Sequence, residues 1–285
     1  SRFHMIHLTL PGELDVMGAS LLTTNRVAIG FNKDIAWTHT VSTAKRFTLY
    51  RLTLNPENPY EYLYDGAYRA MEKRSVTVSV PGDDGQLKTE PHETYFTHFG
   101  PVVESEALPW KNGVAFAMRD AVIDNYLTAA TYDALGKATS TADIEAAISQ
   151  QGVYWTNTVA ADRAGNAFYA DISGTPNIDE SLLERCQIGL AESMTYLILL
   201  RGDDSSCEWY DDPSSQVAGT LPAHKMPRLT RTDYVSNSND SYWLSNADAP
   251  LEGYSPVIGA ERTARSLRTR AGLTQLAELR AQKQK

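Results

Sequence analysis

The chain opens with Ser1, a residue that can act as nucleophile and base by itself. A serine hydroxyl is a weak nucleophile, but a free α-amino group on the same residue can take its proton. Such a serine also needs partner groups elsewhere in the fold. Spacings typical of zinc ligands, such as CxxC and HExxH, do not occur in the sequence, which therefore predicts no metal and no other cofactor.

Two further polar motifs could take part in chemistry. The stretch NSND contains Asn237 and Asn239, and by itself it is typical of a turn, because Asn and Asp bond their own backbone. The stretch WTHTV places His39 two residues before Val41, so both side chains lie on one face of a strand. For His39 the sequence favours a buried, hydrogen-bonded imidazole over a general base.

Strands must position most of these residues. Alternating or β-branched runs predict adjacent antiparallel strands in residues 4–10, 26–31, 35–43 and 46–54. Two alternating runs around PGDDG, within residues 74–98, predict a hairpin.

Helices follow the first strands. Apolar residues at helical spacing predict two short helices in 125–149, and Ser140 or Thr141 could cap the second. Two strands joined by a turn are expected in 155–171, an irregular stretch in 174–228 and a basic helix in 261–285. The pattern predicts an α+β fold.

Composition excludes some classes of partner. The 285 residues are 42% hydrophobic and carry a formal net charge of -9, with a pI near 5.2. An acidic chain is poorly suited to bind a phosphate backbone or an anionic membrane. No stretch approaches the roughly 20 apolar residues of a membrane span.

The chain has two cysteines, Cys186 and Cys207, in a stretch rich in Asp, Ser and Gly. A disulfide there would close a loop and imply an oxidising compartment. The alternative is a pair of unrelated thiols in a cytosolic protein.

Four motifs, in this order, resemble the β subunit of the penicillin acylase family, within it the branch of aculeacin A acylase and the acyl-homoserine lactone acylases. They are HLTLPGELDVMGASL, AWTHTVSTAKRFTLY, WTNTVAADRAGNAFYAD, and NSNDSYWLSN with its ERTARSLRTR tail. The resemblance covers nearly the whole chain. It implies an αββα sandwich of the N-terminal nucleophile hydrolase type, in which a self-cleaved precursor exposes a serine that attacks an acylated amide.

The resemblance also implies that this chain begins after the true nucleophile, so Ser1 is not expected to act. We expect residues 1–285 to be a single domain from inside the β subunit, truncated at both ends, with an incomplete sandwich and inactive alone. The expected partner is the α subunit or the remainder of the same precursor.

Site residues are implied by the same resemblance. The backbone amide of Val41 and the side-chain amide of Asn239 match the two oxyanion donors, with Asn237 as the alternative to Asn239. Arg262 matches an arginine that orients the catalytic asparagine, whereas Arg265 and Arg268 are expected on a solvated helix face. The residues expected to line the acyl pocket are Thr40, Tyr132, Trp155 and Thr156.

The expected function is therefore that of a hydrolase acting on a linear amide C–N bond. Its substrate would be an acyl-homoserine lactone, as in quorum quenching, a lipopeptide, or a penicillin-type amide, and its location periplasmic or secreted. The alternative is a non-catalytic β-rich binding module, favoured only by the strands and aromatic residues.

Overall fold

Two compact units make up the chain in a computed structural model that describes residues 3–22, 24–189 and 196–283. Unit 1 comprises residues 1–46, 121–179 and 210–285, and unit 2 comprises residues 47–120 and 180–209. Each unit is built from segments that are separated along the chain. The expectation of one domain covering residues 1–285 stays a prediction.

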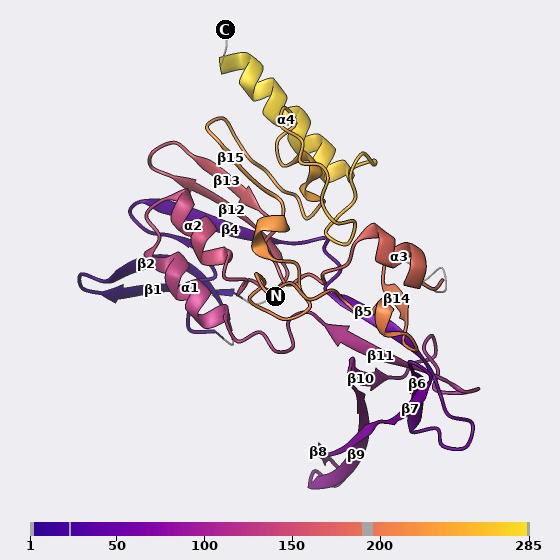
Figure 1. Cartoon of the computed structure of the whole chain (residues 1–285). Coiled ribbons are helices and arrows are strands. Elements are labelled where there is room, and N and C mark those ends of the chain that lie inside the picture. The colour runs from indigo at the N-terminus through magenta and orange to yellow at the C-terminus, as the bar shows by residue number, and fades with distance from the viewer. Residues whose placement is uncertain (1–2, 23, 190–195, 284–285) are drawn as a thin grey trace. The chain divides into compact units, whose positions relative to one another are not determined.

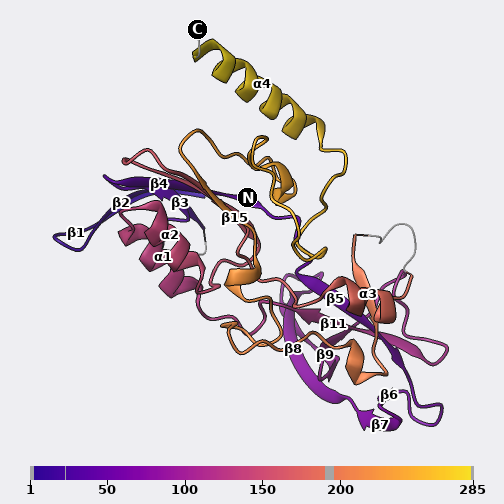
Figure 2. The same ribbon diagram turned by 45° about the horizontal axis from the view of Figure 1, so that its top comes forward.

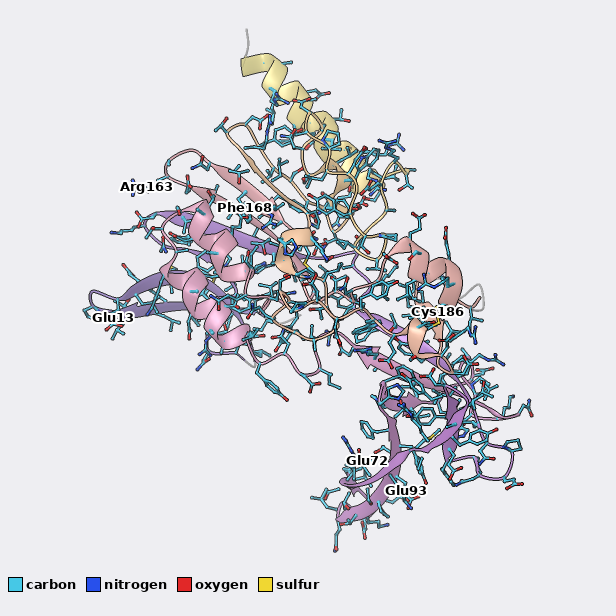
Figure 3. All side chains as sticks on the ribbon, in the orientation of Figure 1. Glu13, Glu72, Glu93, Arg163, Phe168 and Cys186 are labelled. Atoms are coloured by element: carbon cyan, nitrogen blue, oxygen red, sulfur yellow. A yellow bond between two sulfur atoms is a disulfide. The ribbon has the colours of Figure 1, made fainter. Side chains whose placement is uncertain are left out.

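A seven-stranded antiparallel sheet forms the centre of unit 1 (Figure 1). In sheet order its strands are β1 (Phe3–Leu10), β2 (Leu14–Leu21), β3 (Ile29–Phe31), β4 (Ile35–Val41), β12 (Thr156–Asp162), β13 (Ala167–Ala170) and β15 (Arg228–Arg231). The expected strand pair within 155–171 is confirmed, with its turn at Arg163 (Figure 3).

Strand β2 is an addition that the sequence analysis missed. Gly18 faces Gly30 across the β2–β3 pair, and a Cβ on Gly18 would lie 2.2 Å from the Ile29 carbonyl oxygen. The two backbones can approach this closely only because both residues are glycine. Glycine weakens the alternating pattern that marks a strand, so the local signal is poor.

The helices α1 (Thr128–Lys137) and α2 (Thr141–Ile148) cover one face of this sheet (Figure 2). Leu135, Ile144 and Ile148 are fully buried. The cap of α2 is Ser140: its hydroxyl accepts from the Asp143 amide while the Asp143 carboxylate accepts from the Ser140 amide. This capping box confirms the expected break between the two helices.

Unit 2 contains a six-stranded sheet and a small two-stranded one. In sheet order the six are β14 (Ile198–Arg201), β5 (Phe47–Thr53), β11 (Val114–Asp120), β10 (Gly100–Val103), β9 (Leu87–Thr97) and β8 (Glu72–Pro81), and the pair is β6 (Glu61–Tyr64) with β7 (Ala67–Ala70). The β8–β9 hairpin around PGDDG is confirmed.

The stretch expected to be irregular contains regular elements. It includes α3 (Glu180–Cys186), β14, and the 3-10 turns η2 (Ser205–Cys207) and η3 (Ala223–Lys225). Strand β14 pairs in parallel with β5, a contact between distant segments that local pattern cannot reveal.

Cys186 and Cys207 form the expected disulfide, with their Cα atoms 5.4 Å apart (Figure 3). Both cysteines are buried. The bond joins the last residue of α3 to the last residue of η2.

Unit 1 ends in the 3-10 turn η4 (Tyr242–Leu244) and the helix α4 (Leu267–Lys283). The helix begins at Leu267 rather than at residue 261, so Arg262 and Arg265 precede it. Among the described helices, none is long and apolar enough to cross a membrane. The mixture of antiparallel sheets with few helices confirms the expected α+β class.

Candidate active site

The end of β4 presents a backbone amide that the sheet leaves unpaired. The backbone N–H of Ser42 donates to the Trp155 carbonyl oxygen at 3.1 Å. At the opposite end of β4 the backbone N–H of Arg163 donates to the Asp34 carbonyl oxygen at 2.9 Å. Hydrogen-bonded and non-hydrogen-bonded pairs alternate along an antiparallel ladder. The pair Val41–Thr156 is therefore of the second kind, and the Val41 N–H points away from β12. On that side, among the described residues, β3 pairs with β4 only at Ala36 and Trp37.

The side chain of Asn239 lies beside this strand end. Its Nδ2 donates to the Val41 carbonyl oxygen at 3.3 Å. The N–H and C=O of one residue in a strand point to the same side, so Val41 N–H and Asn239 Nδ2 are neighbours. The amide has two N–H groups, and one bond to Val41 leaves the second available as a donor.

Asn239 occupies the left-handed region, with φ of 56°. Asn tolerates this conformation better than most residues because its side chain is short and polar. The Asn239 backbone amide donates to Asn237 Oδ1 at 2.9 Å, which closes a tight turn. Asn237, the alternative to Asn239 in the sequence analysis, therefore holds the turn by accepting this bond.

A polar network fastens the turn to the sheet. The Thr40 hydroxyl donates to Asn237 Oδ1 at 2.6 Å, and Asn157 Nδ2 donates to the same oxygen at 3.3 Å. Tyr169 donates its hydroxyl to Asn157 Oδ1 at 2.6 Å. Asn157 and Tyr169 are almost fully buried. Thr40, expected to line the acyl pocket, is placed in this network.

Arginines hold the other side of the turn. Arg268, near the start of α4, donates to Asn239 Oδ1 at 2.9 Å and also to the Ser238 carbonyl. Arg265 pairs with Asp240 at 2.9 Å, and its side chain is only 5% exposed. Both were expected on a solvated helix face, which is wrong for Arg265. The helical spacing of Arg265 and Arg268 was the sequence signal that could have placed both on the side that faces the turn.

Arg262 is placed elsewhere. It pairs with Glu252, its side chain is 76% exposed, and its φ is 51°. In the described part of the chain its guanidinium bonds the Glu252 carboxylate and not Asn239, and Arg262 precedes α4, on which Arg268 lies. Arg268 is the arginine that bonds the Asn239 side chain, and the orienting role expected for Arg262 stays a prediction.

Asp240 anchors the turn to the start of α4. Its Oδ2 accepts from the Ser266 amide at 3.1 Å and from the Thr269 hydroxyl at 2.8 Å. Burial acts to raise the pKa of Asp240, but the hydrogen bonds from Thr269 and Ser266 outweigh it, and the pKa falls below its usual range. The carboxylate therefore stays ionised opposite Arg265.

The remaining expected pocket residues gather near the same strand end. Thr156 faces Val41 across the ladder, and Trp155 donates its Nε1 to the Ala44 carbonyl at 2.8 Å. Tyr132, on α1, meets His39 edge to face with ring centroids 5.7 Å apart. Val41, His39 and Thr156 therefore share the sheet face that α1 covers.

His39 is a half-buried, hydrogen-bonded imidazole whose Nε2 is shielded from solvent. Its Nδ1 lies 3.2 Å from the Asn157 carbonyl oxygen. Burial lowers the pKa of His39 to about 4, against the opposing effect of that carbonyl. The ring is neutral near pH 7 and is a weak base.

The arrangement can stabilise negative charge on an oxygen. A backbone N–H and a carboxamide N–H, both uncharged and both held by surrounding bonds, are the groups that form an oxyanion hole. Ser1 lies outside the described residues. No group of three or more His, Cys, Asp or Glu side chains in the described ranges is placed to hold a metal ion.

The chain is similar to known proteins over nearly its whole length. The penicillin amidase family model matches residues 1–285. The chain is 41% identical over 280 residues to acyl-homoserine lactone acylase PvdQ of Pseudomonas fluorescens strain Pf-5, covering 98% of this chain and 36% of that protein. It is 38% identical over 280 residues to aculeacin-A acylase of Actinoplanes utahensis, covering 96% of this chain and 35% of that protein.

A solved structure shows the same fold. Thermostable penicillin G acylase from Alcaligenes faecalis superposes with a TM-score of 0.70 at 19% identity, over 97% of this chain and 44% of that chain. The chain spans about a third of the length of the curated relatives. With a family match over its whole length, the chain belongs to the penicillin amidase family.

Proposed function

We propose that this chain is part of an amide hydrolase that removes an acyl chain from an N-acylated substrate. The observation that carries the proposal is the pair formed by the Val41 N–H and Asn239 Nδ2 at the end of β4. The names of the relatives support an acyl-homoserine lactone as substrate, with a lipopeptide as the second choice.

In the proposed reaction a serine hydroxyl attacks the amide carbonyl carbon and the carbonyl oxygen becomes an oxyanion. Val41 and Asn239 donate to that oxygen, and the tetrahedral intermediate collapses to an acyl ester while the protonated amine leaves. Water then hydrolyses the ester. The nucleophilic serine belongs to another part of the enzyme. The α-amine of that serine acts as the base.

The proposed partner is the α subunit or the remainder of the same precursor. An apolar patch on the sheet of unit 1 supports it, on the face opposite α1. Its exposed members are Phe3, Met5, Met17, Leu21 and Phe31. Exposed apolar patches of this kind are typical of surfaces that another chain covers.

The proposed location is periplasmic or secreted. The Cys186–Cys207 disulfide supports it, because such bonds persist in oxidising compartments.

Asn239→Ala in the complete enzyme tests the proposal. Loss of one oxyanion donor should lower kcat about 10²- to 10³-fold for release of the fatty acid from a long-chain acyl-homoserine lactone. Asn112→Ala is a matched control, because Asn112 also has a positive φ, 55°, and its replacement carries a similar backbone strain. Full turnover in Asn239→Ala would contradict the assignment.

A further inference from the structure

A buried carboxylate lies behind the end of β4. Asp171 directly follows β13 and is 1% exposed. Its Oδ2 accepts from the Ser42 hydroxyl at 2.5 Å and its Oδ1 from the Ser173 hydroxyl at 2.9 Å. Across the described ranges, no ion pair joins Asp171 to a basic side chain.

This environment is costly for a carboxylate. Burial raises the pKa of Asp171 to about 6, although both serine hydroxyls act to lower it. Burying a carboxylate without a neighbouring cation costs free energy, which hydrogen bonds to its oxygens offset only in part. The question is what the two hydroxyl bonds hold.

Ser42 connects Asp171 to the strand end, since it follows Val41 in the chain. The Ser42 hydroxyl oxygen accepts from the Ala44 amide at 2.9 Å while donating to Asp171. Ala44 in turn accepts from Trp155 Nε1 at 2.8 Å. The segment from Val41 to Ala44 is thus held through side chains as well as by its last ladder bond.

Ser173 bonds the other oxygen of the same carboxylate. Its hydroxyl donates to Asp171 Oδ1 at 2.9 Å. The two serines are both buried and both bond the same carboxylate. They differ in that only Ser42 adjoins Val41.

We propose that Asp171 is a positioning residue for the oxyanion hole, which acts through Ser42 to hold the Val41 peptide N–H in its productive direction. The inference rests on the proposed function and deepens it. A displacement of about 1 Å at a reacting group can cost on the order of 10²-fold in rate. An anchored backbone donor avoids this loss, because it needs no reorganisation as charge develops.

The test compares Ser42→Ala with Ser173→Ala in the complete enzyme, using acid release from a long-chain acyl-homoserine lactone. Each variant removes one buried hydroxyl from Asp171, and Ser42→Ala also removes the acceptor of the Ala44 amide, so both should lose thermal stability, Ser42→Ala more than Ser173→Ala. For Ser42→Ala we expect kcat to fall about tenfold or more with KM changed less than about twofold, the signature of a bond that matters in the transition state. For Ser173→Ala we expect kcat within about threefold of the parent enzyme.

Equal effects of the two variants on kcat would overturn the inference. So would a Ser42→Ala enzyme that loses thermal stability but keeps its kcat. If Ser42→Ala does not fold, Ser42→Cys replaces the hydroxyl with a weak donor of similar size, and the same fall in kcat is expected. If the complete parent enzyme has no acylase activity, the proposed function itself is overturned. If the parent is active and Ser42→Ala keeps its kcat, this inference alone is overturned.

Discussion

At the scale of single residues, Arg268 decides how the Asn239 amide faces. Its bond to Oδ1 fixes that oxygen, and Nδ2 must then point toward Val41. For Arg268→Ala we expect kcat to fall by about tenfold or more, because the amide can rotate and withdraw its donor. Acid-release kinetics measure this.

Arg262→Ala is the control for Arg268→Ala. An exposed ion pair such as Arg262–Glu252 contributes little to stability, so this variant should keep its kcat and almost all its stability. A larger kcat loss in Arg262→Ala than in Arg268→Ala would restore the assignment made from the resemblance.

Asp171 also predicts a pH dependence of stability. Its pKa is about 6 in the folded chain, above the ordinary 3.8, so the folded state favours the protonated acid. Its contribution is fully present below about pH 4 and is lost as pH rises through about 6. As the pH rises from below about 4 to above about 6, the unfolding free energy of the parent should therefore fall by on the order of 2–3 kcal/mol relative to that of Asp171→Asn.

Urea unfolding of the two proteins at a series of pH values checks this. Subtracting one curve from the other removes His39, whose lowered pKa has the opposite effect in the same range, since its contribution is lost as pH falls. A difference that does not vary with pH would show that Asp171 titrates normally.

At the scale of elements, the disulfide ties α3 to η2. The two cysteines are 21 residues apart, and closing a loop of this length stabilises a fold by about 3 kcal/mol in the chain-entropy account. We expect the Cys186→Ser/Cys207→Ser double variant to unfold at a lower temperature than the parent. Reductant should lower the parent's midpoint to a similar value and leave the double variant unchanged. A midpoint equal to the parent's in oxidising buffer would contradict this.

The sequence predicted helices and strands correctly where neighbouring residues specify the element. The turn residues of PGDDG and the cap at Ser140 specify the hairpin and α2 from neighbouring residues alone. β2 was missed because its glycine weakens the alternating pattern, and β14 was missed because its parallel partner β5 lies far along the chain.

At the scale of the whole molecule, separated segments build each unit. In unit 1 the site draws on residues from β4, from the turn at Asn239 and from α4. The register of β4 against β12 sets the direction of the Val41 amide, and a shift of one residue would turn it toward β12. The donor pair is thus a product of sheet assembly.

The sequence by itself determined the fold class, the hairpin, the helix pair and, through resemblance, the family, and it favoured the disulfide that the structure contains. These features depend on patterns among neighbouring residues or on motifs that are contiguous in the sequence. Only the tertiary structure decided that Arg268 is the arginine at Asn239, and that Asp171 lies behind Val41. Spacing could not choose among Arg262, Arg265 and Arg268, because the choice depends on where α4 begins and how the turn docks on it.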